Sequence, residues 1–435
     1  MASSSRLSEL EVCAVLVREH LIPKVIAAAS SALRLLVLFA LVAFFLSCER
    51  QQQRKARVDR SPIKIGYFGD LSGPTFDFGL SAKNGVLMAT DEINQAGGIN
   101  GRKIDIVIED DQGSPERAAT VVNKLINEDK VVALIVGGAS GISLAAGPKA
   151  QSAKVPMISS SSTNPAVTQI GDYVFRACFI DAFQGEVMAK FAAHTLKAKK
   201  AAIMLDFNSP YSRGLTEFFE LSFAKLGGQV VSQQSYTQGD ADYKGQLSSI
   251  RSTEPDVIYL PGYYGDIAVI AKQARQLGLT QSLLGGDGWD APELWQLAGD
   301  SVNGSYISNH YSVEDPAPAI QKFVRYYKLN YGNLTPDAHA ALGYDAMRFL
   351  IDAIQRAGVV DGPKVRDALA ETKNFPGVTG MISMDRDRNA VKSAVVLKLQ
   401  DTMYIYQETI QPEKVAAASP SASPAVKRPS PRDAK

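Results

Sequence analysis

The sequence predicts an α/β fold made of two Rossmann-like lobes. Residues 131–136 and 155–158 are apolar runs without alternation, which is typical of strands covered on both faces of a parallel sheet. Such runs alternate with amphipathic segments up to about residue 180, and the alternation restarts at Lys200. With 435 residues, the chain is long enough for two domains of ordinary size.

The composition is that of a globular protein, with 46% apolar and 21% charged residues. The net charge of +1 is unevenly distributed, because residues 61–412 hold about six more acidic than basic side chains. An acidic body is a poor surface for phosphate backbones, so we expect no nucleic-acid partner.

The N-terminal part of the chain resembles a bacterial lipoprotein leader. Arg34 precedes a twelve-residue apolar core, residues 35–46, which is short for a membrane span but suits a signal peptide. The ending Phe45-Leu46-Ser47-Cys48 resembles a lipobox, although Phe45 replaces the usual Leu. We therefore expect residues 1–48 to be a signal peptide and Cys48 to carry the lipid that anchors an extracytoplasmic protein to the membrane. A single uncleaved anchor is the alternative.

Two further segments flank the expected globular part. Residues 49–61 are polar and basic, as in a tether that could lie on anionic lipid head groups. Residues 413–435 consist largely of Ala, Ser, Pro and basic residues, which predicts a disordered tail. With Cys13 in the leader and Cys48 lipidated, Cys178 has no partner for a disulfide in the mature chain.

The first lobe is expected to alternate strands and helices. Ala82, Val86, Ala89 and Ile93 have helical spacing, and glycines at 97 and 98 end that helix. A cap, proline and acid at residues 114–116 begin the next helix. The expected strands are residues 63–68, 103–108, 131–136 and 155–158, and the first helix is residues 79–95.

The second lobe repeats this pattern. Its expected helices are residues 182–197 and 214–226, and its expected strands are residues 200–205, 229–234, 256–260 and 283–284. A loop of residues 206–211 separates the first of these strands from its helix. The remaining chain predicts helices at 318–331, 338–356 and 363–372 and β-structure at 377–383 and 394–399.

Loops rich in hydroxyls and glycine follow two strands of the first lobe, at residues 137–143 and 159–165. Ligands of open α/β sheets bind outside the carboxyl ends of the strands, where these loops fall. Backbone N–H groups at a helix start, with hydroxyls beside them, form a small anion site. The loops therefore predict a grip on the carboxylate of a small zwitterion; a turn with capping hydroxyls is the alternative.

A series of short motifs, in one order, covers the chain from about Ser61 to Gln407. They are Ile63-Lys64-Ile65-Gly66, Ser72-Gly73-Pro74, Asp91-Glu92-Ile93-Asn94, Gly97-Gly98-Ile99-Asn100-Gly101-Arg102, Glu109-Asp110-Asp111-Gln112, Pro156-Met157-Ile158-Ser159, Thr163-Asn164-Pro165, Pro261-Gly262-Tyr263-Tyr264, Gly285-Gly286-Asp287-Gly288-Trp289 and Phe375-Pro376-Gly377-Val378-Thr379-Gly380. Together they resemble the branched-chain amino-acid-binding proteins of bacterial ABC transporters, the leucine-binding-protein-like family of type I periplasmic binding proteins.

The resemblance implies two lobes joined by a three-crossover hinge, with the ligand in the cleft between them. The N-terminal lobe would comprise residues 62–181 plus about 313–388, and the C-terminal lobe residues 182–312 plus about 389–412. It further implies a monomeric periplasmic receptor that delivers an amino acid to a membrane permease with cytoplasmic ATPases. A sensory receptor for amino acids or amides with the same fold is the alternative.

The resemblance also implies which residues hold the ligand. First-lobe hydroxyls would hold its α-carboxylate or share its ammonium, an acid of the second lobe would pair with the ammonium, and aromatic side chains would line the cleft. The hydroxyls are those of Ser140 and Thr163 with the backbone of Ser161, the acid is Asp287, and the aromatic residues are Phe78, Tyr211 and either Tyr263 or Tyr264.

Enzyme and cofactor motifs are absent from the sequence. The Gly138–Gly141 segment lacks the second spaced glycine of a nucleophile elbow, and the chain has no GxxxxGK phosphate loop. We therefore expect neither an enzyme nor a cofactor. The acids 109–111 are expected to order a strand end rather than to bind metal, and His194, His310 and His339 lack the spacing of zinc ligands.

Overall fold

The computed structural model describes residues 39–40 and 60–412. The predictions for the signal peptide, for Cys48, for the tether up to residue 59 and for the tail at 413–435 lie outside the described residues. Residues 61–412 lie in one compact unit. Within the two described ranges, no helix has both the length and the apolar character needed to cross a bilayer.

The first lobe is built on a five-stranded parallel sheet in the order β2-β1-β3-β4-β5. Its central strands are buried on both faces, which is why they appear in the sequence as unbroken apolar runs. The strands are β1 (Ile63–Gly69), β2 (Ile104–Asp110), β3 (Ala133–Gly137), β4 (Met157–Ser159) and β5 (Val174–Arg176).

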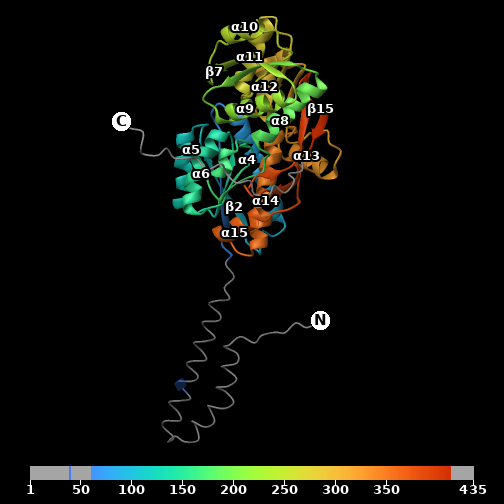
Figure 1. Ribbon diagram of the computed structural model, residues 1–435. Coiled ribbons are helices and arrows are strands. Elements are labelled where there is room, and N and C mark those ends of the chain that lie inside the picture. Colours follow the sequence, from blue (N-terminus) through green and yellow to red (C-terminus); the bar gives the residue numbers. More distant parts are fainter. Residues whose placement is uncertain (1–38, 41–59, 413–435) are drawn as a thin grey trace, which may run out of the picture. The chain divides into compact units, whose positions relative to one another are not determined.

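Helices from an early and from a late part of the described chain cover this sheet (Figure 1). One face packs against α5 (Pro115–Asn127) and α6 (Ser140–Ala153), and the other against α4 (Phe76–Gln95) and α14 (Ala338–Ala357). The helices α4 and α14 approach each other so closely at Gly85 that a Cβ added to this glycine would lie 2.0 Å from the carbonyl oxygen of Ala340. The lobe also holds α7 (Ala166–Gln169), α13 (Pro318–Asn330), α15 (Gly362–Ala370) and the small strands β11 (Phe375–Gly377), β12 (Gly380–Met384) and β13 (Ala390–Val391).

The second lobe is built on a seven-stranded sheet in the order β15-β14-β10-β9-β8-β6-β7. The five strands from β10 to β7 are parallel, and β14 and β15 add antiparallel strands at one edge. The strands are β6 (Lys200–Asp206), β7 (Gln229–Tyr236), β8 (Val257–Tyr259), β9 (Ser282–Gly285), β10 (Ser305–Asn309), β14 (Ala394–Gln400) and β15 (Met403–Ile410).

Short helices cover both faces of this sheet. Those lying between β5 and β10 in sequence appear in green and yellow in Figure 1. They are α8 (Asp181–Lys190) with the π-helical turn η2 (Phe191–Thr195), α9 (Pro210–Lys225), α10 (Lys244–Arg251), α11 (Tyr264–Gln276), η3 (Asp287–Trp289), α12 (Pro292–Ala298) and η4 (Gly299–Val302).

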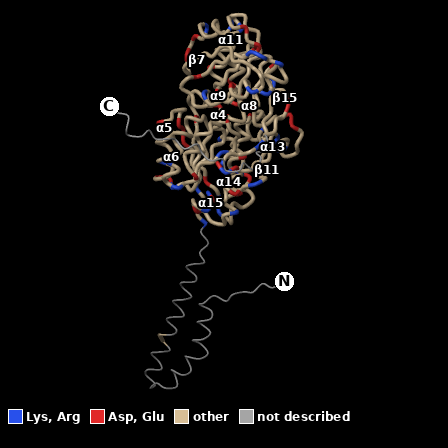
Figure 2. The backbone as a smooth tube through the Cα atoms, in the orientation of Figure 1, with Lys and Arg blue, Asp and Glu red and all other residues tan. Residues whose placement is uncertain are grey.

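The predicted fold class is confirmed: the chain passes between the two sheets three times, at residues 177–180, 310–317 and 392–393. In the described part of the chain, Lys and Arg are interspersed with Asp and Glu over both lobes (Figure 2).

Several helix boundaries differ from the prediction, two of them by four residues or more. The helix expected at 214–226 begins at Pro210, because the Ser209 side chain accepts a hydrogen bond from the backbone N–H of Ser212 and proline fits the first helical position. Tyr211, expected in a loop, therefore lies in the first turn of α9. The helix expected at 182–197 ends its regular part at Lys190 and continues as η2.

Candidate functional site

A buried cavity lies between the lobes, where the carboxyl ends of strands from both sheets meet. The first lobe contributes the turn after β3 and the loop after β4, and the second contributes the segments that follow β6, β8 and β9. This is the position expected for a ligand site in open α/β sheets. The lining residues are Phe78, Gly138, Ala139, Ser140, Ser161, Tyr211, Tyr263, Asp287, Gly288 and His339.

Six of the eight residues assigned to the ligand site from the sequence line this cavity. Thr163 and Tyr264 do not, although both are buried next to lining residues. About 10 Å³ of the cavity can hold the centre of a water molecule. One water requires roughly 10–15 Å³, and ligand pockets usually span roughly 300–1,000 Å³. In this arrangement the lobes are therefore closed around a space that is too small for an amino acid.

The first-lobe wall is a network of serine hydroxyls. Ser140 lies at the start of α6, and its Oγ accepts a hydrogen bond from the backbone N–H of Asn164 at 3.2 Å. Ser161 Oγ donates to the carbonyl oxygen of Gly138 at 3.3 Å, and the hydroxyls of Ser143 and Ser162 lie 2.7 Å apart. These bonds hold the loops after β3 and β4 together, and they leave the Ser140 hydroxyl hydrogen free to be donated.

The second-lobe wall is organised around the buried carboxylate of Asp287. Its Oδ1 accepts hydrogen bonds from Gln184 Nε2 at 2.7 Å and from the Tyr211 hydroxyl at 2.9 Å. Its Oδ2 lies 3.1 Å from His310 Nε2. Since an ionised carboxylate can accept about four hydrogen bonds, one acceptor position remains for a further donor.

Hydrogen bonds keep Asp287 charged despite its burial. Burial alone raises the pKa of Asp287, but the hydrogen bond from His310, the charge that His310 gains in acid and the hydrogen bond from Gln184 lower it below its ordinary value. Burial lowers the pKa of His310 to about 4, so His310 is neutral near pH 7 and its Nε2–H is the donor. The ring of His310 stacks on Phe179 at 3.8 Å between centroids.

Aromatic rings close the remaining side of the cavity. Tyr211 and Tyr263 stack with centroids 5.0 Å apart, and the Tyr211 hydroxyl also accepts from the backbone N–H of Gly288 at 3.1 Å. Phe78 stacks on His339 at 4.0 Å and meets Tyr264 edge to face at 5.2 Å. Of the adjacent tyrosines, Tyr263 faces the cavity, and Tyr264 begins α11 and packs behind Phe78.

Three site residues were not found in the sequence: Gln184, His310 and His339. Gln184 resembles any polar residue of a helix, and His310 follows β10, which the sequence did not reveal. His339 lies in the first turn of α14, and only the position of α14 against α4 brings it to the cavity. Neither of its ring nitrogens has a partner within the geometric limits of a hydrogen bond. Burial lowers its pKa to about 4, although the charge of Asp287 opposes that change.

A second buried acid, Asp181, lies behind the cavity at the start of α8. Neither of its oxygens has a hydrogen-bond partner within the geometric limits of such a bond. Burial raises its pKa to about 8, the nearby Thr163 hydroxyl opposes that rise, and the charge of Asp287 adds to it. Asp181 is therefore largely protonated at pH 7, which spares the site a second buried negative charge.

Of the acids at 109–111, Asp110 and Asp111 order loops, and Glu109 pairs with Lys124 of α5. Asp110 accepts hydrogen bonds from the backbone N–H groups of Leu71 and Gln112 and from Ser72 Oγ, and Asp111 accepts from the N–H of Gly113. Among the described residues, no group of three or more His, Cys, Asp or Glu side chains is arranged to hold a metal ion.

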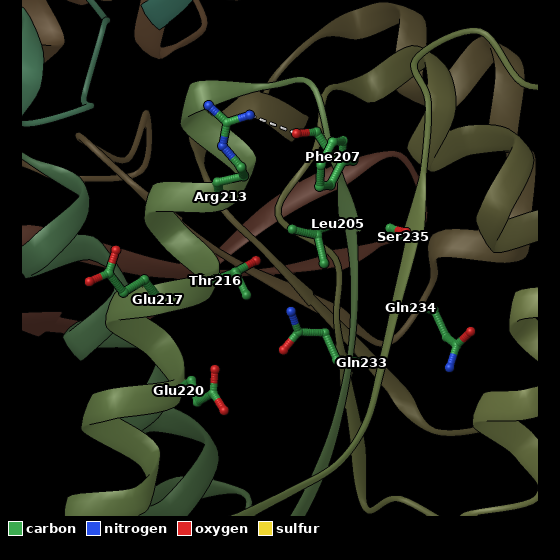
Figure 3. Close-up of a pocket in the computed structure, with 9 residues that line it drawn as sticks. All are labelled: Leu205, Phe207, Arg213, Thr216, Glu217, Glu220, Gln233, Gln234 and Ser235. Atoms are coloured by element: carbon green, nitrogen blue, oxygen red, sulfur yellow. Dashed lines mark hydrogen bonds between the residues drawn. The ribbon is translucent and has the colours of Figure 1, made fainter. Parts of the chain in front are cut away.

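A groove of about 410 Å³ lies on the second lobe between α9 and the β6–β7 edge (Figure 3). Its charged residues, Arg213, Glu217 and Glu220, are exposed, and Arg213 donates a hydrogen bond to the carbonyl oxygen of Phe207. The groove lacks the convergent buried polar groups of the interlobe cavity, which is therefore the better candidate for a ligand site.

Comparison with known proteins agrees with this geometry. The model of the family described as periplasmic binding protein matches residues 62–407. An amino acid binding protein of Pseudomonas aeruginosa is 30% identical over 332 residues, which cover 75% of this chain and 86% of that protein. A Leu/Ile/Val-binding protein of Rhizobium johnstonii is 29% identical over 331 residues, which cover 75% of this chain and 89% of that protein.

Solved structures show the same architecture. The leucine binding protein LivK of Thermotoga maritima has 40% sequence identity and a TM-score of 0.77, covering 80% of this chain and 99% of that one. The branched-chain amino acid transporter substrate binding protein LivJ of Streptococcus pneumoniae, in complex with isoleucine, has 34% identity and a TM-score of 0.76, covering 81% and 100%. The chain therefore belongs to the periplasmic binding protein family, and the resemblance to branched-chain amino-acid-binding proteins of type I architecture is confirmed.

Proposed function

We propose that the protein is the extracytoplasmic receptor of an ABC importer, which binds a small amino acid by closure of its lobes and delivers it to a membrane permease. One observation carries this proposal: the cavity between the lobes places hydroxyls of one lobe opposite the carboxylate of Asp287 on the other. A zwitterion needs both kinds of group, because an unpaired charge is costly to bury.

The α-carboxylate would be held by the first lobe. The Ser140 hydroxyl can donate to it, and the N-terminus of α6 adds backbone N–H groups together with the positive end of the helix dipole. The backbone at Ser161 lies on the same wall. We assign Thr163 a supporting role, because its backbone carbonyl oxygen accepts from the N–H of Asp181 at 2.9 Å.

The α-ammonium would be held by the second lobe, at the open acceptor position of Asp287. Hydrogen bonds to charged groups contribute roughly 1.5–3 kcal/mol each. Four or five of them, less the ordering costs, are enough for the roughly −8 kcal/mol of a micromolar complex. Because the two ends of the ligand are held by different lobes, tight binding would favour the closed arrangement over the open one.

The side chain of the ligand would meet aromatic rather than charged surface, at Phe78, Tyr263 and His339. Such a wall suits Leu, Ile or Val, the amino acids in the names of several relatives. Isoleucine is the bound ligand in the related LivJ structure. We propose binding without catalysis or a cofactor, because the proteins that this chain resembles are named as binding proteins.

A calorimetric titration with Leu, Ile, Val and a panel of other amino acids and small amides tests the proposal. We expect at least one of the three to bind with micromolar affinity, and Asp287→Asn to weaken it at least tenfold, roughly the loss of one charged hydrogen bond. Asp300→Asn, an exposed acid on η4, is the matched control and should bind normally. If Asp287→Asn binds with unchanged affinity, the assignment of Asp287 as the partner of the α-ammonium is wrong. If no amino acid or amide of the panel binds to the wild-type protein, the proposed function is wrong.

The role in transport and the membrane anchor need separate tests. Genes for a permease and two ATPases beside this one would favour transport over the alternative role of a sensory receptor. We further propose that lipidated Cys48 holds the protein on the membrane, so Cys48→Ser should release it into the soluble fraction. Continued membrane association of that variant would point to an uncleaved anchor.

A further inference from the structure

A second pocket, of about 380 Å³, lies where the connections between the lobes meet the edge of the second sheet. Its size is in the range of small-molecule sites, unlike that of the closed interlobe cavity. The wall includes side chains of η3–α12, of the segment after β10, of the turn before α14, and of the β14–β15 hairpin. The lining residues on which the argument rests are Asp290, Trp295, Glu314, Asp337, Met403 and Tyr404.

One side of this pocket is apolar and aromatic. Trp295 and Tyr404 meet edge to face with centroids 5.8 Å apart, and the Tyr404 hydroxyl donates to the carbonyl oxygen of Trp289 at 2.9 Å, which fixes its ring. Leu397 lies among these residues, and Met403 is 56% exposed at the rim. Rigid rings and a flexible methionine form a surface that suits the apolar body of a small molecule.

The other side of the pocket carries carboxylates. Asp290 is 4% exposed and accepts hydrogen bonds from Asn309 Nδ2 and from the backbone N–H of Ala338, each at 2.8 Å. Both bonds reach Oδ2, which leaves the acceptor positions of Oδ1 open. Asp337 accepts from the N–H of Ala340 at 2.8 Å and from Ser81 Oγ at 2.5 Å.

The electrostatics of this wall favour a cation. Glu314 is the third acid at the pocket, and its fifteen lining residues include no Lys, Arg or His. Burial raises the pKa of Asp337 to about 8 and the neighbouring Asp290 contributes to that rise, so Asp337 holds a proton near pH 7 unless a cation lies beside it; burial also raises the pKa of Asp290. A positive charge between these carboxyls would offset the cost of holding two acids close together.

We propose that this pocket is a second binding site, which takes a small organic cation with an ammonium group beside an aromatic or apolar body. The ammonium would lie against Asp290 and Asp337, and the apolar body against Trp295 and Tyr404. The pocket shares no lining residue with the interlobe cavity, so the inference does not depend on the proposed function.

Phenethylamine is a suitable probe, because phenylacetate and 2-phenylethanol present the same ring with a negative charge and with no charge. We expect calorimetry on the whole chain to show one saturable phenethylamine site, with the alcohol and the anion binding at least tenfold more weakly. Saturable binding of all three with equal affinity, or no saturable binding of phenethylamine at millimolar concentration, would overturn the proposal.

Substitutions locate the site. Met403→Lys places a positive charge at the rim and should weaken phenethylamine binding at least fivefold, while Met381→Lys, at an equally exposed methionine (56%) on β12, should not. Asp290→Asn should weaken binding about tenfold, since its amide oxygen can keep the bonds to Asn309 and Ala338 while the charge is lost. Phenethylamine binding that is lost in Asp287→Asn but kept in Met403→Lys would place the amine in the interlobe cavity and contradict the proposal.

Discussion

The Tyr211 hydroxyl donates a hydrogen bond to Asp287 Oδ1 at 2.9 Å and accepts one from the backbone N–H of Gly288 at 3.1 Å. One phenol therefore fixes both the carboxylate and the backbone of the η3 turn that carries it. The two residues lie 76 positions apart in the sequence. Their contact joins the start of α9 to the end of β9 and orients the acid toward the first lobe.

Tyr211→Phe removes these two hydrogen bonds and keeps the stacking on Tyr263. We expect the free energy of unfolding to fall by about 1–3 kcal/mol, because a charged and a neutral bond are lost inside the protein. Ligand affinity should fall several-fold, since Asp287 loses a fixed orientation. Urea denaturation and calorimetry measure the two effects. Tyr406→Phe, whose exposed hydroxyl bonds only to Thr409, is the matched control and should change neither quantity.

Asp181→Asn tests the raised pKa of the buried acid. The folded protein keeps a proton on Asp181 up to a pKa of about 8, whereas the unfolded chain releases it near the ordinary value of 3.8. The contribution of Asp181 to stability is thus fully present below pH 4 and is lost as the pH rises toward 8.

The difference between wild type and Asp181→Asn should therefore grow in favour of the variant between pH 5 and pH 8, by up to about 1.4 kcal/mol per pH unit. Urea unfolding at both pH values, with Asp91→Asn at an exposed position as control, measures it. A difference independent of pH would mean that Asp181 is ionised throughout this range.

His339→Gln should show the opposite pH dependence. Burial lowers the folded-state pKa of His339 from 6.5 to about 4, so the unfolded chain binds a proton that the folded protein does not. Wild type should lose stability relative to His339→Gln as the pH falls from 6.5 toward 4. Thermal unfolding at pH 7 and pH 5 tests this, and parallel changes in the two proteins would contradict the assignment of a buried neutral imidazole.

Gly85→Ala tests the contact between α4 and α14. The added Cβ would lie 2.0 Å from the carbonyl oxygen of Ala340 and 2.6 Å from the backbone N of Tyr344, so the helices must move apart. We expect a loss of about 1–3 kcal/mol, as for overpacked cores. Gly245→Ala in α10, whose Cβ would meet nothing within 4 Å, should be neutral or should stabilise the protein by up to about 1 kcal/mol.

The strands that the sequence revealed include β3, β4 and β8, which are buried on both faces. The strands β10 and β15 were missed for different reasons. Ser305 and Ser308 of β10 are fully buried, but serines in a short segment resemble a loop. The edge strand β15 is largely exposed, so it lacks a continuous apolar run.

By itself, the sequence determined the two α/β lobes and the hydroxyl loops after β3 and β4, because apolar periodicity and strand-end chemistry are local properties of the chain. Asp287 was singled out only by the resemblance of its motif to a known family. Only the tertiary structure decided that Tyr263 rather than Tyr264 faces the cavity, that Gln184 and His310 hold the carboxylate, and that His339 completes the wall. These residues come from α8, from the segment after β10 and from α14, and packing between distant segments determines where they meet.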